Sequence, residues 1–450
     1  METRKIDYLI IGGGPVGIQA CRMLRMSRPD VSVTVLRPEP FSVIYCAIPY
    51  VIEGILDPMQ IAKKDELITE TGAELLQIPA TGVDFAAHTV TLEDGQCLQY
   101  GRLIIATGAV PFVPPVPGSE LKNIFTVKTA KDTEVIKNAA KAAAKVVVIG
   151  AGAIGIEQAQ AMKALGLDVH LVDMAPHPLS TMVDGEFGKI IADQIVAAGI
   201  HWQGSSPLQN FKGIHAVEEV VLSNGSSIVL HPGSDFVIVS AGVKPELSLF
   251  RDSGLEIAND GIVVNDRMQT NIADVYAAGD CVHFVSGIDG RPLGGKLATN
   301  AVPMAKVLAK NLLGKPATYK GFFNGAATCV SELRVGGTGF TESFAQRRGF
   351  EVVCGFGQTT SKFPIMPGAK KVQVKLVADA KTGKLLGGQI LGPDAVAERI
   401  DVISLALQHQ LHLSDLAELS YSAQPWQTFY PAANPIVMAA EEALKKLRAL

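Results

Sequence analysis

The stretch Ile6-Asp-Tyr-Leu-Ile-Ile-Gly-Gly-Gly-Pro-Val-Gly17 joins a short apolar run to a glycine-rich turn, and Ile18–Arg28 then has the pattern of a helix. The apolar run is typical of a buried parallel strand. Gly12, Gly14 and Gly17 permit a tight turn and let the backbone approach a pyrophosphate that rests on the helix N-terminus. Strand, G-x-G-x-x-G and helix in this order predict a dinucleotide-binding unit.

A second unit with the same order of features follows in the middle of the chain. The apolar run Lys145–Ile149 precedes Gly150, Gly152 and Gly155, and the next predicted strand ends at Asp173. The spacing in sequence between Gly150 and Asp173 is that expected of an acid that binds the ribose hydroxyls of a dinucleotide. The charge of Asp173 opposes the extra phosphate of NADPH, so the sequence favours NADH over NADPH.

The first unit departs from this pattern at the end of its second strand. The strand Val31–Leu36 is followed by Arg37, and the nearest acid is Glu39. Glu39 could bind the ribose from two positions further on, which makes it the candidate in this unit.

Two further strand ends carry small or acidic residues. One predicted buried strand ends in Ala106, Thr107 and Gly108, and another ends in Gly279 and Asp280. Ligands of open α/β sheets bind beyond the carboxyl ends of the strands, so the side chain of Asp280 is a candidate ligand contact. For Asp280 a surface turn is the alternative.

A single cysteine lies in the apolar loop Phe41–Gly54. Cys46 is followed by Pro49, and proline is tolerated in the first turn of a helix. Cys46 is therefore expected just before a helix start, where the helix dipole favours the thiolate. A buried cysteine that packs as a small hydrophobe is the alternative.

Composition limits the classes of function. The 450 residues carry a formal charge of −4, which gives no electrostatic footprint for nucleic acid. Six scattered cysteines without a Cys-x-x-Cys pair do not form a disulfide framework, and the pair His409 and His412 lacks further ligands, so no metal site is expected. No signal peptide or membrane-spanning run is recognised, and we expect a cytoplasmic protein.

The expected fold is α/β, with two Rossmann-like dinucleotide-binding domains and a C-terminal α+β domain. A Pro-rich connector ends near Gly118, and the pattern changes near Gly321 to antiparallel strands followed by helices. The stretch 58–71 is expected to be helical. The expected boundaries are 1–118 and 244–320 for the first domain, 119–243 for the second and 321–450 for the third.

Taken together, these motifs resemble the FAD-dependent pyridine nucleotide–disulfide oxidoreductases over essentially the whole chain. The resemblance implies that FAD binds the first glycine motif, Ala106-Thr-Gly108 and Gly279-Asp280, and that NAD(P)H binds the second motif. It also implies that Glu157 lies beside the nicotinamide and flavin, and that the C-terminal domain forms a homodimer.

The segment Cys46-Ala-Ile-Pro-Tyr50 is similar to the redox motif of the single-cysteine branch, which includes coenzyme A disulfide reductases, NADH oxidases and persulfide reductases. Members with a redox disulfide carry a second cysteine five residues on, where this chain has Val51. The resemblance therefore implies that Cys46 cycles alone. Tyr421 and Tyr430, supplied across a dimer interface, are candidate proton donors or pocket walls; interface packing is their alternative role.

Two departures bear on the substrate. Oxidase and peroxidase members have a histidine where this chain has Pro15-Val16, which counts against oxygen or peroxide as the substrate. Gln424 stands where glutathione reductase-type members place a proton-transferring histidine. Arg22, Arg25 and Arg28 could approach a coenzyme A phosphate, or simply form a solvated helix face.

The sequence thus supports an NADH-dependent FAD enzyme that reduces a small-molecule disulfide, persulfide or polysulfide to a thiol at Cys46. The alternative is an FAD- and NAD-binding electron-transfer subunit that passes electrons between NAD(H) and an iron–sulfur redox partner protein.

Overall fold

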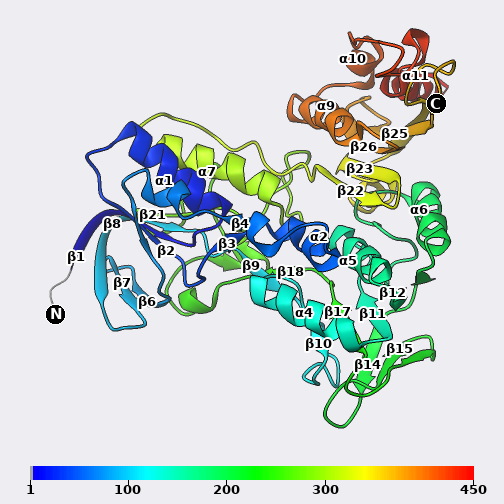
Figure 1. Cartoon of the computed structure of the whole chain (residues 1–450). Coiled ribbons are helices and arrows are strands. Elements are labelled where there is room, and N and C mark those ends of the chain that lie inside the picture. The colour runs from blue at the N-terminus through cyan, green and yellow to red at the C-terminus, as the bar shows by residue number, and fades with distance from the viewer. Residues whose placement is uncertain (1–3, 450) are drawn as a thin grey trace.

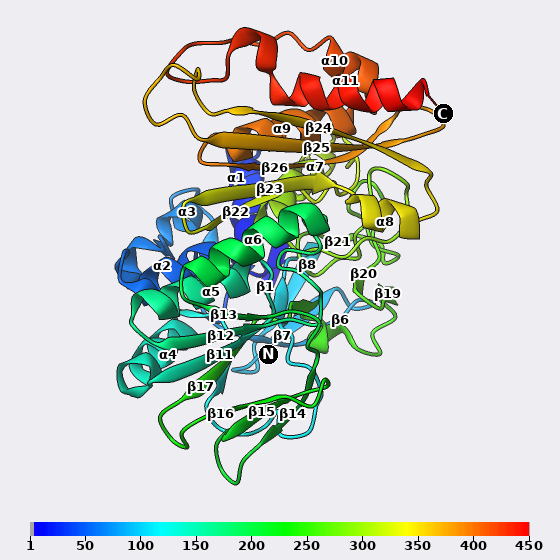
Figure 2. The ribbon, with the colours of Figure 1, turned by 90° about the vertical axis from the view of Figure 1, so that its right-hand side faces the viewer.

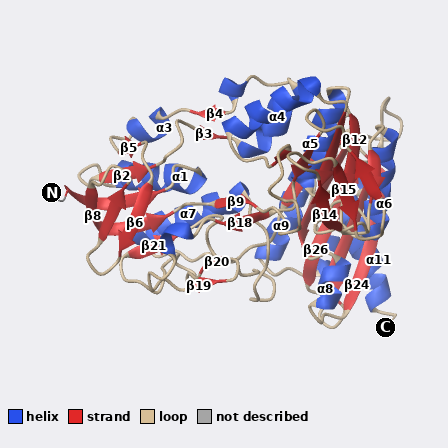
Figure 3. Cartoon of the chain, turned by 90° about the horizontal axis from the view of Figure 1, so that it is seen from below, coloured by secondary structure: helices blue, strands red, loops and turns tan. Residues whose placement is uncertain are grey.

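The computed structural model describes residues 4–449 and confirms the α/β class. Three large sheets organise the chain, and each is covered by its own helices (Figure 1). The N-terminus and the C-terminus lie at opposite ends of the molecule (Figure 3). Within residues 4–449, no helix combines the length and the apolar character that crossing a bilayer would require.

The N-terminal sheet has seven strands in the order β5-β2-β1-β8-β7-β6, with β21 paired to β8. The pairs β1–β2, β1–β8 and β8–β21 are parallel, as expected of a dinucleotide-binding unit. Its strands are β1 (Arg4–Ile11), β2 (Val33–Leu36), β5 (Glu74–Leu76), β6 (Ala80–Asp84), β7 (Thr89–Leu92), β8 (Cys97–Ile105) and β21 (Val275–Ala277). The helices near it are α1 (Pro15–Ser27), α3 (Glu66–Thr69) and α7 (Ala298–Leu312).

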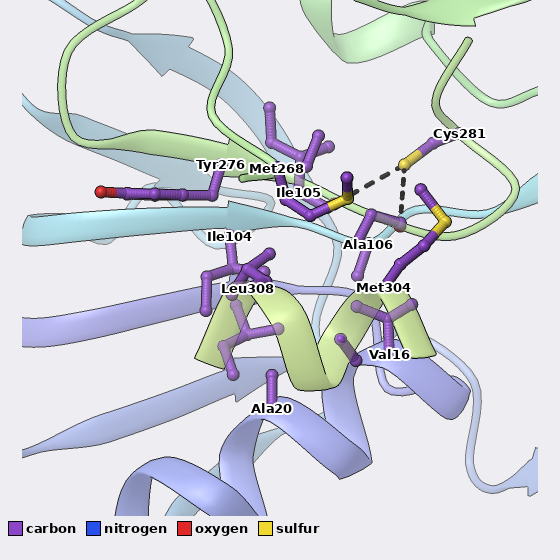
Figure 4. Packing of buried hydrophobic residues seen from close by; sticks show 14 of the residues in the cluster. Val16, Ala20, Ile104, Ile105, Ala106, Met268, Tyr276, Cys281, Met304 and Leu308 are labelled. Carbon is purple, nitrogen blue, oxygen red and sulfur yellow. Dashed lines mark hydrogen bonds between the residues drawn. The ribbon is translucent and has the colours of Figure 1, made fainter. Parts of the chain in front are cut away.

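The core of this first body joins segments that are far apart in sequence. Val16 and Ala20 of α1 lie beside Met304 and Leu308 of α7, and all four are buried (Figure 4). The late segments β21 and α7 therefore pack in the same hydrophobic core as β1 and α1. Short ribbons accompany it: β3 (Ser42–Val43) with β4 (Ala62–Lys63), β9 (Ala109–Pro111) with β18 (Val243–Pro245), and β19 (Ile257–Ala258) with β20 (Gly261–Ile262).

The second sheet has five parallel strands in the order β10-β17-β11-β12-β13. They are β10 (Ile124–Phe125), β11 (Lys145–Ile149), β12 (Asp168–Val172), β13 (His201–Gln203) and β17 (Phe236–Val239). The accompanying helices are α4 (Ala130–Ala142), α5 (Ala153–Ala164) and α6 (Gly185–Ala197). A three-stranded antiparallel sheet follows in the chain: β14 (Leu208–Lys212), β15 (Glu219–Leu222) and β16 (Ser227–Val229).

The C-terminal sheet is antiparallel in the order β22-β23-β26-β25-β24, and α9 and α11 pack against the same face of it in one hydrophobic core (Figure 2). Its strands are β22 (Ala326–Val330), β23 (Leu333–Gly339), β24 (Val352–Thr360), β25 (Lys371–Asp379) and β26 (Leu385–Gly392). Its helices are α8 (Glu342–Arg347), α9 (Val396–Gln408), α10 (Leu413–Ala417) and α11 (Pro435–Leu447). The α+β character expected here is confirmed, while the residue numbers of the domain boundaries stay predictions.

The expected single helix over 58–71 is wrong. The stretch forms a short 3-10 turn (Pro58–Gln60), then β4, then α3. The physical reason is strand pairing: Ser42 and Val43 pair with Lys63 and Ala62. This pairing of β3 with β4 overrides the local helical pattern, because it holds residues 62–63 in an extended conformation beside residues 42–43.

A buried lysine joins the second and third bodies. Lys375 of β25 is fully buried, and its ammonium contacts Glu342 at 2.7 Å, Asp184 at 3.1 Å and also Glu186. Burial alone would lower the pKa of Lys375, but the hydrogen bonds to Glu186 and Glu342 and the charge of Asp184 raise it above its ordinary value. The side chain of Gln389 donates to Asp184 at 2.6 Å, so the cluster links α6 to the C-terminal sheet.

Candidate functional site

In the first glycine turn, two of the three glycines are closely packed against backbone atoms and the third faces open space. Gly12 has φ +119°, and a Cβ there would lie 2.1 Å from the carbonyl oxygen of Ala106. A Cβ on Gly17 would lie 2.0 Å from the oxygen of Gly12, whereas one on Gly14 would meet nothing within 4 Å. Only glycine fits the two closed positions, and the open one leaves room for a phosphate to approach the backbone at the start of α1.

Asp280 lies beyond the end of β21, beside the same turn. Its Oδ1 is buried and has no hydrogen-bond partner among the described residues. Burial raises the pKa of Asp280, and the charges of Lys128 and Lys296 oppose that rise. An unpaired buried carboxylate oxygen is costly and fits a missing donor such as a ribityl hydroxyl, so the residues present fit a flavin at this place.

The loop residues Ala106, Thr107 and Gly108 continue β8 toward Asp280. Thr107 donates its hydroxyl hydrogen bond to the carbonyl of Glu246 at 2.8 Å, which ties the two separate parts of the first body together. Gly108 has φ +73° and Gly279 has φ +82°, so both turns use backbone conformations that favour glycine.

Arg37, which replaces the expected acid after β2, has a structural role. Its guanidinium is buried, contacts Asp65 at 2.8 Å and donates to the backbone oxygens of Glu39 and Pro40. These bonds shape the loop that presents Glu39, whose side chain is exposed. Burial raises the pKa of Tyr45, and the charges of Glu39 and Asp280 raise it further. Glu39 and Asp280 therefore both face the site beside Tyr45.

The second glycine turn has the same construction. Cβ atoms on Gly150 and Gly155 would lie 2.4 Å from the oxygen of Ser240 and 1.8 Å from that of Gly150, while Gly152 faces open space. Asp173 follows β12 directly, and its carboxylate accepts hydrogen bonds from the backbone N–H of Ala151 at 2.5 Å and Ala175 at 2.7 Å. The predicted ribose-binding acid is therefore held against the glycine turn.

Glu157 lies on α5, downstream of this turn, and reaches the C-terminal sheet. It accepts a hydrogen bond from the hydroxyl of Thr328 on β22 at 2.7 Å. Burial raises the pKa of Glu157, and the bond from Thr328 opposes the rise. The same carboxylate raises the pKa of Tyr50 on the helix after Cys46, although burial is the larger cause there. Glu157 and the Cys46 loop thus approach one another.

Cys46 sits where the sequence predicted it. It lies in a 3-10 turn (Tyr45–Ala47) that leads into α2 (Ile48–Glu53), and it is exposed. Val51, five residues further along, is fully buried. Cys46 is therefore an accessible thiol before a helix start, and the alternative of a buried, packed cysteine is wrong.

Two lysines, one near Cys46 and one beside the neighbouring Tyr45, were missed by the sequence reasoning. Lys63 of β4 is half-buried; burial lowers its pKa and the Cys46 charge opposes that effect. The ammonium of Lys128 lies 4.4 Å from the centre of the Tyr45 ring. Burial lowers the pKa of Lys128, and the charges of Asp280 and Glu39 oppose that decrease. No local motif marks either lysine, because strand pairing and the connector between domains bring them here.

Tyr421 and Tyr430 lie in the C-terminal body and remain largely exposed, at 42% and 53%. Tyr421 donates its hydroxyl hydrogen bond to the carbonyl of Pro431 at 2.6 Å, and the ring of Tyr430 packs edge-on against Phe363. Among the described residues, neither forms a hydrogen bond or ring contact with the Cys46 loop. A single chain thus leaves these two aromatic residues available to a partner.

The chain matches two family profiles and full-length relatives. Residues 6–305 match the pyridine nucleotide-disulphide oxidoreductase family, and residues 326–428 match its dimerisation domain. An NADH oxidase of Methanocaldococcus jannaschii is 33% identical over 98% of this chain and 99% of its own length. An NAD(P)H coenzyme A polysulfide/persulfide reductase of Pyrococcus horikoshii is 30% identical, over 98% of both chains. An NAD-dependent persulfide reductase from A. fulgidus has a TM-score of 0.93 at 27% identity, over 99% of this chain and 84% of its own.

Proposed function

The chain belongs to the pyridine nucleotide-disulphide oxidoreductase family, and from this premise we propose that it is an NADH-dependent FAD enzyme that reduces a disulfide, persulfide or polysulfide at Cys46. As a member of the family it is an oxidoreductase that binds FAD and NAD(P)H. The observation that carries the proposal is the exposed Cys46 at the start of α2, with Val51 in place of a second cysteine. The name of the Pyrococcus horikoshii relative supports the sulfur substrate.

The proposed reaction has two stages: a thiol–disulfide exchange at Cys46, and a two-electron reduction of the mixed disulfide that this exchange leaves. The Cys46 thiolate attacks one sulfur of R–S–S–R′, forms a mixed disulfide with R–S, and expels R′–S⁻, which takes up a proton. Two electrons from NADH and a second proton then release R–SH and restore the thiolate, so that NADH is converted to NAD⁺. FAD, when bound, supplies the two-electron chemistry that links nicotinamide to sulfur.

Protein side chains supply charge and position for these two stages. Lys63 places a half-buried cation near Cys46. Glu157, which is held by Thr328, positions the nicotinamide side of the site. Asp280, Glu39 and the first glycine turn hold the flavin nucleotide, and Asp173 with the second turn holds NADH.

We place Tyr421 and Tyr430 on the partner subunit's side of the site, as pocket walls or proton donors. The chain carries the family's dimerisation domain, and both rings are exposed in the single chain. A homodimer would bury them and complete the pocket above Cys46.

The basic residues of α1 differ in their freedom to bind a coenzyme A phosphate. Arg25 donates to the carbonyls of Thr71, Pro29 and Val31, and Arg28 is paired with Asp30 at 2.6 Å. Arg22 has no hydrogen-bond or ion-pair partner within residues 4–449, so it is the best candidate of the three if the substrate carries a phosphate.

Replacing Asp280 with alanine is expected to weaken FAD binding by about 10- to 100-fold, the effect of losing one charged hydrogen bond. Because the pKa of Asp280 is raised without the cofactor, binding the ionised form releases a proton at pH values below that pKa. Affinity should therefore fall as the pH falls in the wild type. Fluorescence titration of the apoprotein with FAD measures both effects.

Asp280→Asn is the matched control, since it keeps an acceptor oxygen and cannot ionise. Its FAD affinity should change less with pH than that of the wild type. Equal affinity of wild type and Asp280→Ala at neutral pH would show that this carboxylate does not hold the flavin.

Replacing Asp173 with alanine should narrow the preference for NADH over NADPH by about 1–3 kcal/mol, because it removes an acceptor for the ribose hydroxyls and the charge that opposes a 2′-phosphate. The ratio of kcat/KM for the two nucleotides measures this. Asp173→Asn, which keeps one oxygen for the backbone N–H groups of the glycine turn, separates charge from loop support. A wild-type preference for NADPH would contradict the assignment.

The substrate is identified by anaerobic assays run side by side. Coenzyme A disulfide, coenzyme A persulfide and polysulfide are compared under nitrogen, with oxygen tested separately. We expect at least one sulfur compound to be reduced with a kcat/KM well above that for oxygen. Turnover with oxygen alone would overturn the sulfur proposal. If Cys46→Ser keeps its physiological activity and the protein copurifies with an iron–sulfur partner, it is an electron-transfer subunit instead.

A further inference from the structure

Three side chains with metal-binding atoms converge at the edge of the second sheet. Asp168 and His170 are two residues apart on β12 and share a face of the strand. His201 on β13 is paired in register with His170. Since β13 is the last strand of the sheet, the group lies at its rim, and strand pairing alone brings the two histidines together.

The donor atoms have the spacing of a single coordination sphere. Nε2 of His201 lies 3.0 Å from Oδ1 of Asp168, and Nε2 of His170 lies 3.5 Å from its Oδ2. One donor atom of each residue lies within 4.8 Å of the others. Ligands about 2.0–2.2 Å from a tetrahedral Zn²⁺ are separated by roughly 3.3–3.5 Å, so small side-chain rotations would fit an ion between them.

We propose that Asp168, His170 and His201 form a binding site for a divalent transition-metal cation, with Zn²⁺ as the ion of reference. Two imidazoles and one carboxylate are ligands that Zn²⁺, Co²⁺ and Ni²⁺ accept, and Mg²⁺ and Ca²⁺ do not favour imidazole. His201 is 60% exposed, so an ion can enter from solvent and a water can complete the coordination. The proposed reaction does not use these residues.

The arrangement of the two imidazole rings fits this assignment. The two rings are stacked with centroids 4.6 Å apart and planes 24° from parallel, which directs both Nε2 atoms toward the same carboxylate.

Two features of the site limit the affinity for a metal ion. The ammonium of Lys145 lies 3.9 Å from Asp168 and competes for its charge. Nδ1 of His170 is buried without a partner among the described residues, so no acceptor orients that ring. Because loss of such support costs about 10- to 100-fold in metal affinity, we expect a dissociation constant on the order of micromolar.

The site lies at the start of β12, whereas Asp173 follows the end of that strand. A bound ion would join the edge strand β13 to β12 without touching the nucleotide. The expected consequence is a higher unfolding temperature for the protein with metal, and unchanged affinity for NADH.

The test is equilibrium dialysis of the full-length, FAD-loaded protein against Zn²⁺, with the metal counted per chain. All proteins carry Cys46→Ser, which removes the exposed thiol as a competing ligand. His201→Ala and Asp168→Asn are compared with the control His412→Ala, another surface histidine, which lies 3.9 Å from the single carboxylate of Asp415.

We expect one micromolar zinc site that both His201→Ala and Asp168→Asn lose and His412→Ala keeps, together with a zinc-dependent rise in unfolding temperature that disappears with the site. Retained FAD in each variant shows that it is folded. Equal zinc binding in all four proteins, or no zinc bound up to millimolar concentration, would show that the cluster is only a histidine–carboxylate ion pair.

Discussion

Cys46→Ser is expected to lower the rate of sulfur-substrate reduction by on the order of 10³-fold or more, because it removes the nucleophile that forms the mixed disulfide. Hydride transfer from NADH to the flavin should stay within about a few-fold of wild type, since Cys46 does not belong to the second glycine turn, where we propose that NADH binds. Steady-state assays with the sulfur substrate and with an artificial dye acceptor measure the two activities separately.

The remaining cysteines provide the controls for this prediction. Cys97→Ser is the matched one, because Cys97 is also partly accessible but lies on β8 in the strand pair with β7. Cys281 is fully buried, and burial raises its pKa to about 11, so it is an inert thiol next to Asp280, the proposed flavin ligand. If Cys97→Ser loses sulfur reduction while Cys46→Ser keeps it, the redox assignment is wrong.

Lys375→Met is expected to destabilise the protein by about 3 kcal/mol, because it leaves Asp184 buried without its cation. Glu186 and Glu342 are partly exposed, so water can replace part of their lost interaction and the effect stays at the lower end for a buried ion pair. The measurement is the urea midpoint of the FAD-loaded protein, followed by circular dichroism.

The control for Lys375 is Lys381→Met. Lys381 also has a carboxylate partner, Glu351 at 2.7 Å, but both side chains are exposed and the pair is screened by water. Its urea midpoint should change little. If the two variants unfold at the same urea concentration, the buried cluster does not hold the second and third bodies together.

The sequence predicted both units of strand, glycine turn and helix because their signals are local. A strand, three glycines and a helix follow one another directly, and the steric contacts at Gly12 and Gly150 explain why these positions are glycine. Cys46 was also placed correctly, because Pro49 marks the start of the helix that follows it.

Features made by long-range pairing could not be predicted in the same way. Lys63 approaches Cys46 because β4 pairs with β3, a ladder that also breaks the helix expected over 58–71. The rim cluster of His170 and His201 depends on the register between β12 and β13, so spacing along the chain could not reveal it. Arg37 was an anomaly in the sequence, and its buried contacts explain it as a support for the Glu39 loop.

The central claim is that Cys46 is the second electron carrier, and stepwise anaerobic reduction of the purified protein tests it most directly. We predict that the wild type with oxidised Cys46 takes up about four electrons per chain rather than about two. After the first two, a long-wavelength charge-transfer band between the Cys46 thiolate and the oxidised flavin should appear, and Cys46→Ser should lack it. Uptake of about two electrons by both proteins, with no such band in the wild type, would contradict the account.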